Sequence, residues 1–184
     1  FGPVGTADVW LHFCASLSYD IETRIDDEGR PDIRDLVTVL EYGEGEVLSE
    51  AGLTVSALRV DHPPVTDCFA LKFEAEGKSV VFSADTAFFP PLADFARSSD
   101  ILVHEALHPE GLERLIAKTG NGARLREHLT ASHTFAEYVG RIASKANTGH
   151  LVLHHLVPAD DPEITADDWS REVRKTWSGE LTIG

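Results

Sequence analysis

The chain has 184 residues, of which 42% are hydrophobic and 26% charged, a balance typical of one soluble globular domain with a proper core. Thirty-one acidic residues stand against 16 Lys and Arg, which gives a formal net charge of −15. A field of that sign repels phosphate backbones, so the composition argues against nucleic acid as a partner. No apolar run approaches the length of a membrane span, and we expect a cytoplasmic protein without membrane contact.

The first half of the chain predicts a helix followed by antiparallel strands. Residues 7–17 place Val9, Trp10 and Phe13 at helical spacing, whereas the charged stretch DDEGRPD at 26–32 predicts an exposed loop. Strands are predicted at residues 37–42, 53–60, 69–75 and 79–83, with turns at 50–52 and 76–78. Cys14 and Cys68 lie far apart in apolar contexts, which predicts buried free thiols in a reducing compartment.

The second half alternates between helical and strand patterns. Helices are predicted at residues 91–97, 109–118, 134–146 and 166–177. Strands are predicted at residues 101–105, 151–155 and 180–183. This alternation is typical of βα units, so we expect a mixed sheet, or two sheets, with helices outside.

Three predicted strands are followed by a residue that can bind a metal. They are His62 in ALRVDHPP, Asp85 in SVVFSADTA and His155 in GHLVLHHLVP. A buried strand delivers the side chains at its end to the edge of a sheet, where functional sites are built. His, Asp and His form a ligand set that suits Zn²⁺ or a similar divalent ion.

Each of the three has an ordinary structural alternative. Asp85 is of a type that often caps a turn, and His62 precedes Pro63 and therefore also suits a turn. Neighbouring residues of a strand point to opposite faces, so only one of His154 and His155 can face a given site. His155 is the better candidate because it immediately precedes the LVP turn.

Two further residues have the character of proton-transfer groups. Glu105 closes the apolar strand ILVHE, where a buried carboxylate needs a partner. His133 precedes a predicted helix and is a candidate general acid, held by Glu105 through a hydrogen bond. The alternative for His133 is a bond to the backbone of its own helix. Roles for His104, His128 and His154 stay open at this point.

Taken in order, the segments VDHPP, VVFSADTA, ILVHEA, SHTFAEYVGRIA and LVLHHLVP resemble the metallo-β-lactamase superfamily, in particular its ribonuclease Z and arylsulfatase-like branch. The resemblance implies an α/β fold, the αββα sandwich, with residues 1–184 forming one incomplete domain that lacks its N-terminal part. It implies that His62 binds one metal ion, His155 a second, and Asp85 both, although the family usually has Gly where this chain has Ala84. Glu105 and His133 resemble the pair that shuttles protons to the leaving group.

The superfamily signature HxHxDH, which supplies most of the metal ligands, is absent from the chain. The nearest string, from His12 to Cys14, does not fit it. Because the chain also lacks Met, even at position 1, we expect that it begins downstream of the signature. The alternative is a degenerate member that has lost the motif. We expect the 184-residue chain alone to bind metal weakly and to be nearly inactive.

For the intact protein the resemblance implies a hydrolase that uses two divalent metal ions, Zn²⁺ first and Mn²⁺ or Fe as alternatives, to activate a hydroxide. Ribonuclease Z proteins carry a long tRNA-binding insertion where this chain has a plain hairpin. Together with the negative charge, this favours a small ester as substrate: an aryl sulfate, a phosphodiester or a lactone. The exposed sheet edge favours a homodimer. Two alternatives remain, a single-metal hydrolase and a non-catalytic binding or scaffold protein of the same fold.

Overall fold

A computed structural model describes residues 1–184 and divides them into two compact units, Phe1–Gly43 and Glu44–Gly184. Each unit is described by itself, and the prediction that the chain forms one domain stays a prediction. None of the helices is both long enough and apolar enough to cross a bilayer.

The first unit consists of short elements with little buried surface. They are β1 (Gly2–Pro3), α1 (Thr6–Ser16), α2 (Ser18–Glu28), α3 (Ile33–Leu36) and β2 (Glu41–Tyr42), with β1 and β2 paired in parallel. The predicted first helix is confirmed as α1. The predicted loop at 26–32 is partly wrong, because α2 continues to Glu28. This helix buries only Ile21, so its sequence carries no apolar periodicity to reveal it.

The second unit is built on one mixed sheet of seven strands. They are β3 (Gly45–Glu50), β4 (Leu53–Arg59), β5 (Phe69–Ala75), β6 (Lys78–Phe82), β7 (Ile101–Leu107), β8 (His150–Val157) and β9 (Glu180–Ile183). They lie side by side in chain order. The pairs from β3 to β6 are antiparallel, and those from β6 to β9 are parallel. The predicted change from hairpins to βα units is therefore confirmed.

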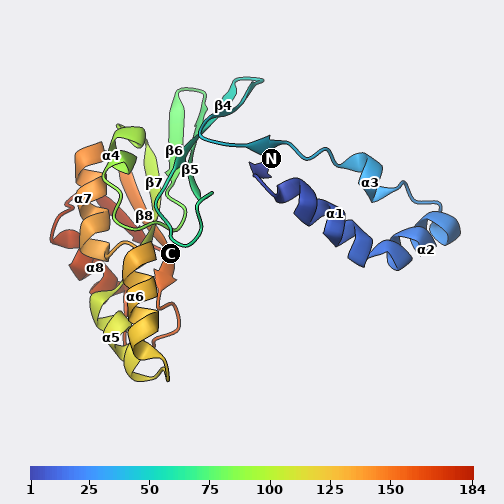
Figure 1. The fold of residues 1–184 in the computed structure, drawn as a ribbon. Helices are drawn as coiled ribbons and strands as arrows, with labels where there is room; N and C mark the ends of the chain where they lie inside the picture. The colour runs from blue at the N-terminus through green and yellow to red at the C-terminus, as the bar shows by residue number, and fades with distance from the viewer. The chain divides into compact units, whose positions relative to one another are not determined.

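Five helices accompany the sheet: α4 (Pro91–Phe95), α5 (Pro109–Ala117), α6 (Gly122–Ser132), α7 (Ala136–Ala146) and α8 (Ala166–Arg174). Of these, α4, α7 and α8 gather on one face of the sheet (Figure 1), where they enclose the main core around Leu102, Leu151 and Ile142. Gly140 permits the close packing of α7 on α8, since a Cβ there would lie 2.7 Å from the carbonyl oxygen of Val173. A smaller core joins β7 to α5 and α6.

Several further elements differ from the predictions. The strand that precedes the turn at 50–52 is β3, Gly45–Glu50. Of the predicted strand 37–42, only Glu41–Tyr42 form a strand, β2. Helix α6 was not predicted. The strand expected to stop at His155 continues to Val157, because one residue bulges and the pairing with β7 then resumes.

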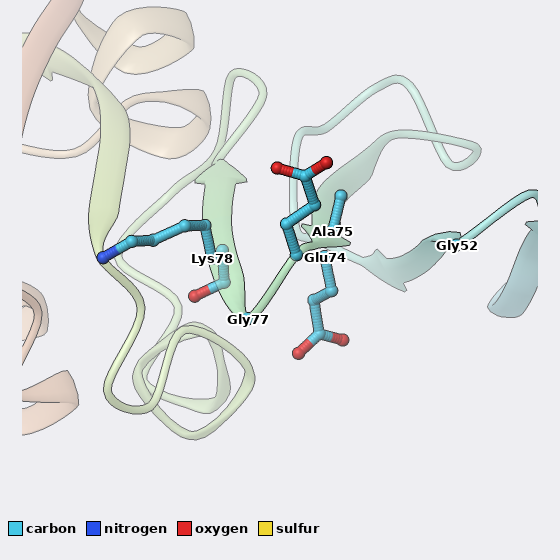
Figure 2. A pocket seen from close by; sticks show the side chains of 7 residues that line it. Gly52, Glu74, Ala75, Gly77 and Lys78 are labelled. Carbon is cyan, nitrogen blue, oxygen red and sulfur yellow. The ribbon is translucent and has the colours of Figure 1, made fainter.

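The hairpin that joins β5 to β6 carries a shallow pocket of about 300 Å³ at its turn (Figure 2). Acidic Glu74 and Glu76 line it beside Lys78, whose amine lies 2.8 Å from a carboxylate oxygen of Asp100. Since β5 ends and β6 begins at this turn, the pocket lies at the opposite end of these strands from Asp85. The predicted metal ligands therefore do not take part in it.

Candidate metal centre

All five predicted site residues lie at one edge of the sheet, either near the carboxyl end of a strand or in a loop beside it. The pairing of Arg59 with Phe69, and of Leu71 with Phe82, brings the end of β4 and the start of β5 next to the end of β6. Strands β7 and β8 run parallel to β6, so their carboxyl ends open at the same edge. The loops that carry His62, Asp85 and His133 converge there. This edge brings together residues that stand up to 93 positions apart in the chain.

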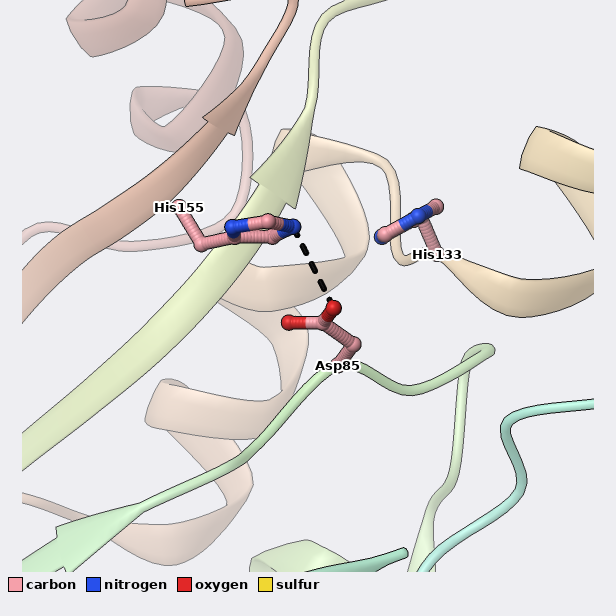
Figure 3. Close-up of side chains that lie close together, drawn as sticks. All are labelled: Asp85, His133 and His155. Carbon is pink, nitrogen blue, oxygen red and sulfur yellow. Dashed lines mark ion pairs between the residues drawn. The ribbon is translucent and has the colours of Figure 1, made fainter. Parts of the chain in front are cut away.

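Asp85, His133 and His155 form a cluster whose candidate ligand atoms all lie within 4.8 Å of one another. Figure 3 shows the three side chains directed toward a common point. The Nε2 atom of His155 lies 3.2 Å from an oxygen of Asp85, and both side chains are partly exposed, at 47% and 34%. The rings of His133 and His155 stack with centroids 5.7 Å apart. The cluster therefore has an open side and a buried side.

The backbone is left-handed at two positions of this cluster. Ala84 has a φ of +55° and His155 a φ of +43°, values that ordinary residues rarely adopt. His155 is the bulged residue of β8, since His154 pairs with Glu105 and Leu156 with Ala106. A bulge changes the direction of a side chain. His155 points toward Asp85 at this bulge, inside the strand and not at a turn that follows it. Strain of this kind is concentrated at functional sites.

His62 lies beside the cluster rather than inside it. Its ring stands edge-on to that of His133, with centroids 5.5 Å apart. Its Nδ1 atom lies 2.9 Å from the carbonyl oxygen of Ser132, the last residue of α6. Because a carbonyl can only accept a hydrogen bond, Nδ1 is the donor, and the lone pair of His62 is on Nε2. A histidine held in this way is typical of a metal ligand.

Glu105 is the most deeply buried charged group at this edge, with no exposed surface. One carboxylate oxygen accepts a hydrogen bond of 2.7 Å from the backbone N–H of Thr134 and a longer one of 3.5 Å from that of Thr86. The other oxygen lies 3.3 Å from Nδ1 of His133. The predicted partnership of Glu105 and His133 is thus present in the geometry, and it leaves Nε2 of His133 to face Asp85 and His155.

The buried pair holds a proton readily. Burial raises the pKa of Glu105, an effect that its bonds to His133 and to the backbone oppose. Burial also acts to lower the pKa of His133, but the hydrogen bond and charge of Glu105, with the charge of Asp85, outweigh it and raise this pKa. His133 therefore lies between a buried carboxylate and a partly exposed one, with its pKa above the ordinary value.

Three further histidines lie outside the cluster. His104 is fully buried, and its Nδ1 donates to the carbonyl oxygen of Glu105 at 2.6 Å. Burial, with the nearby His154, lowers the pKa of His104 to about 4. His108, which the sequence did not single out, caps α5 by accepting a bond from the N–H of Gly111. His128 is exposed on α6.

Asp85 and His155 of the cluster, with His62 beside it, fit a divalent ion by their donor types, and the first two also by their spacing. Two ligand atoms about 2.0–2.2 Å from one zinc ion lie roughly 3.3–3.6 Å apart in a tetrahedral site. The 3.2 Å between His155 and Asp85 is close to that spacing. Two imidazoles and a carboxylate are ligands that Zn²⁺, Mn²⁺ and Fe²⁺ all accept.

Sequence reasoning missed the residues that support this site. Thr86 and Thr134 are completely or almost completely buried. Thr86 directly follows Asp85, and Thr134 directly follows His133. Besides the adjacent carbonyl of Ala87, their hydroxyl groups contact backbone carbonyl groups 25 and 48 positions away, which no local pattern encodes.

Comparison with known proteins supports the resemblance seen in the sequence. The chain is 27% identical along its whole length to a putative ribonuclease Z of Mycobacterium tuberculosis strain CDC 1551, of which it spans 79%. It is also 27% identical to the ribonuclease Z of strain H37Ra, and there it spans 64%, less than two thirds of that relative. No family model matches the chain.

Solved structures share the fold. The metallo-β-lactamase fold protein YhfI of Bacillus subtilis superposes with a TM-score of 0.60 over 88% of this chain and 60% of that one, at 23% identity. Zinc-bound PqqB of Methylobacterium extorquens gives 0.53 over 80% of this chain and 52% of that one, at 15% identity. The predicted fold class is confirmed, because these structures have the metallo-β-lactamase fold. In sequence the chain is similar to ribonuclease Z proteins.

Proposed function

We propose that this protein is a metal-dependent hydrolase of phosphodiester bonds. The likeness to ribonuclease Z along the whole chain supports this substrate class. It also argues against the prediction, made from the net charge of −15, that nucleic acid is an improbable partner. Net charge describes the molecule as a whole, whereas binding of a phosphate backbone depends on the field at the site. The predicted homodimer stays a prediction.

In this proposal His62, Asp85 and His155 are the residues of this chain that would hold divalent metal ions, Zn²⁺ being the first candidate. Bound there, such ions would lower the pKa of water and stabilise the negative charge that develops on a phosphoryl group. The open side of the cluster, where Asp85 and His155 are exposed, is where a phosphodiester can approach. The left-handed backbone at His155 and at Ala84, directly before Asp85, is consistent with ligand side chains held in an unusual direction.

His133 is the proposed proton donor to the leaving oxygen. The observation that carries this role is its position between two carboxylates, with Glu105 on Nδ1 and Asp85 on the side of Nε2. Glu105 keeps the ring oriented and stabilises its positive charge. The proton on Nε2 passes to the leaving oxygen as the bond from phosphorus to that oxygen breaks. Proton transfer by a positioned group contributes roughly 10²–10⁴-fold to a rate.

The role of His133 is tested by comparing leaving groups. On bis-p-nitrophenyl phosphate the leaving phenolate needs little help from a proton, whereas a dinucleotide releases a ribose hydroxyl that needs one. In the full-length protein, His133→Ala should lower kcat on the dinucleotide by about 10²–10⁴-fold and affect the aryl substrate much less. His128→Ala, an exposed histidine on α6, is the matched control.

Bound metal is measured in the same samples. An equal loss on both substrates together with lost metal would make His133 a ligand and contradict its role as proton donor. The absence of any metal-dependent hydrolysis in the wild-type protein would favour the non-catalytic binding alternative.

A small apolar ester is a second candidate substrate, and one observation favours it. A groove of about 610 Å³ lies next to the His62 turn, and its lining includes the apolar Leu58, Pro63, Val65 and Phe89 beside the charged Glu44, Arg59 and Asp61. Such a surface suits an aryl or acyl group better than a sugar–phosphate chain. Turnover of p-nitrophenyl sulfate or an aryl lactone at rates above those of any phosphodiester would favour this candidate.

A further inference from the structure

We propose that Thr134 is a positioning residue, which fixes the loop of Asp85 relative to the Glu105–His133 pair through its side-chain hydroxyl. The proposal rests on the function proposed above. Asp85 lies in a loop outside regular secondary structure, between β6 and α4, and His133 lies in the break between α6 and α7. No ladder of strand or helix hydrogen bonds holds these two side chains at a fixed separation. Other contacts must therefore set the geometry of the cluster.

Thr134 makes three hydrogen bonds, which reach two separate parts of the fold. Its N–H donates to a carboxylate oxygen of Glu105 at 2.7 Å, and its carbonyl oxygen accepts from the N–H of Leu107 at 2.8 Å. These two backbone bonds attach it to β7. Its hydroxyl donates to the carbonyl oxygen of Thr86, next to Asp85, at 2.7 Å. The hydroxyl is thus the link from the proton-donor pair to the loop that carries the metal ligand.

Thr86 extends the same connection to the third loop. Its hydroxyl lies 2.9 Å from the carbonyl oxygen of Ala87 and 3.3 Å from that of Asp61. The N–H of Ala87 also donates to Asp61, at 2.7 Å, so the segment before His62 is held against the Asp85 loop. Both threonines are buried, at 0% and 1% exposure, where water cannot substitute for a missing hydroxyl.

The backbone and the side chain of Thr134 make different contacts, so the effect of the hydroxyl on the site can be tested apart from the bonds to β7. The two backbone bonds of Thr134 are independent of its side chain, so replacing the hydroxyl by a methyl group leaves them in place. Val has nearly the shape of Thr, and Thr134→Val therefore removes only the link to Thr86. A small displacement of reacting groups can cost a large factor in rate, about 100-fold for a misplacement of 1 Å.

The test compares three variants of the full-length protein. Thr134→Val removes the hydroxyl, and Thr134→Ser retains it. Thr148→Val is the matched control, since Thr148 is another buried threonine whose hydroxyl donates to a backbone carbonyl, that of Ser99 at 3.0 Å, away from the site. Two properties are measured: kcat and KM on a dinucleotide, and the visible absorption spectrum of the Co²⁺-substituted protein, which reports the geometry around the bound ion.

We expect Thr134→Val to lower kcat by about tenfold or more, with KM within about twofold of the wild-type value, and to change the cobalt spectrum. Thr134→Ser should keep the kcat and the cobalt spectrum of the wild-type protein. Thr148→Val should lower thermal stability and leave both unchanged. A Thr134→Val protein whose kcat and cobalt spectrum match those of Thr148→Val would overturn the proposal. Thr134→Ala, which adds no bulk, gives the same comparison if the Val variant does not fold. If the wild-type protein cleaves no phosphodiester, the proposed function fails, whereas the cobalt spectra still decide whether the hydroxyl sets the site.

Discussion

His104 makes the stability of the sheet sensitive to acid. The side chain is fully buried in β7, next to Glu105, and its pKa is lowered to about 4 because burial penalises the charged form. In the unfolded chain an imidazole takes up its proton near its ordinary pKa of about 6.5. The unfolded state therefore binds more protons between these two values, and the free energy of unfolding falls as the pH drops through that window.

The size of the effect follows from the width of the window. A shift of about 2.5 pKa units corresponds to about 3 kcal/mol once the pH lies below both values, and about 2 kcal/mol of this is lost between about pH 7 and about pH 5. Other groups contribute with different signs. The pKa of His154 is lowered by burial and by His155, while that of His133 is raised by Glu105. A variant is needed to isolate the contribution of His104.

His104→Gln keeps a side-chain donor for the carbonyl oxygen of Glu105 and removes the titrating group. Urea unfolding, followed by the fluorescence of the buried Trp169 and Trp177 in a Trp10→Phe background, should show a smaller loss of stability on acidification than the parent, by about 2 kcal/mol between about pH 7 and about pH 5. His128→Gln, at an exposed position, should keep the parental slope. Identical slopes for His104→Gln and the parent would refute the reasoning, since they would mean that His104 can take up a proton in the folded state.

Two further substitutions test local features of the fold. Ala84→Gly should raise the free energy of unfolding by up to about 1 kcal/mol, because Ala84 occupies a left-handed φ of +55° that costs an L-residue about 1–2 kcal/mol. Ala87→Gly in the same loop, where φ is not positive, should destabilise, and a loss of stability in both would contradict the strain argument. Thr165→Ala should cost about 1 kcal/mol in thermal or urea unfolding, because Thr165 and Asp168 form a capping box at the start of α8. If Thr165→Ala leaves the stability unchanged, the capping box stabilises α8 no more than water does.

Apolar periodicity in the sequence located the elements that form the core. Strand β9 has the predicted bounds, and β7, α7 and α8 lie within a few residues of theirs, because each buries an apolar face against the main cluster. The elements that were missed bury little. Helix α2 has one buried residue and β3 none, so their sequences have no apolar face to recognise. Helix α6 buries only Leu129 and Ser132 and was missed for the same reason.

The candidate site could be predicted as a set of residues and not as a geometry. Asp85, His133 and His155 stand out because polar groups close apolar runs or flank a helix. The bulge that aims His155, and the hydroxyl bonds of Thr86 and Thr134, depend on pairing between distant segments. A change of register by one residue would reverse the direction of every side chain in a strand, so such contacts cannot be read from local patterns.

Metal binding by the full-length protein is the most direct test of the central claim, that Asp85 and His155 are ligands of a metal-dependent hydrolase. Zinc bound at equilibrium is measured by dialysis for the wild-type protein, for Asp85→Ala and for His155→Ala, with His128→Ala as the control. We expect the wild-type and control proteins to bind two ions per chain. Removing a group that only hydrogen-bonds to a metal ligand typically weakens metal binding by roughly 10–100-fold. We expect each ligand variant to weaken zinc binding by at least that factor. Unchanged zinc stoichiometry and affinity in both ligand variants would contradict the account.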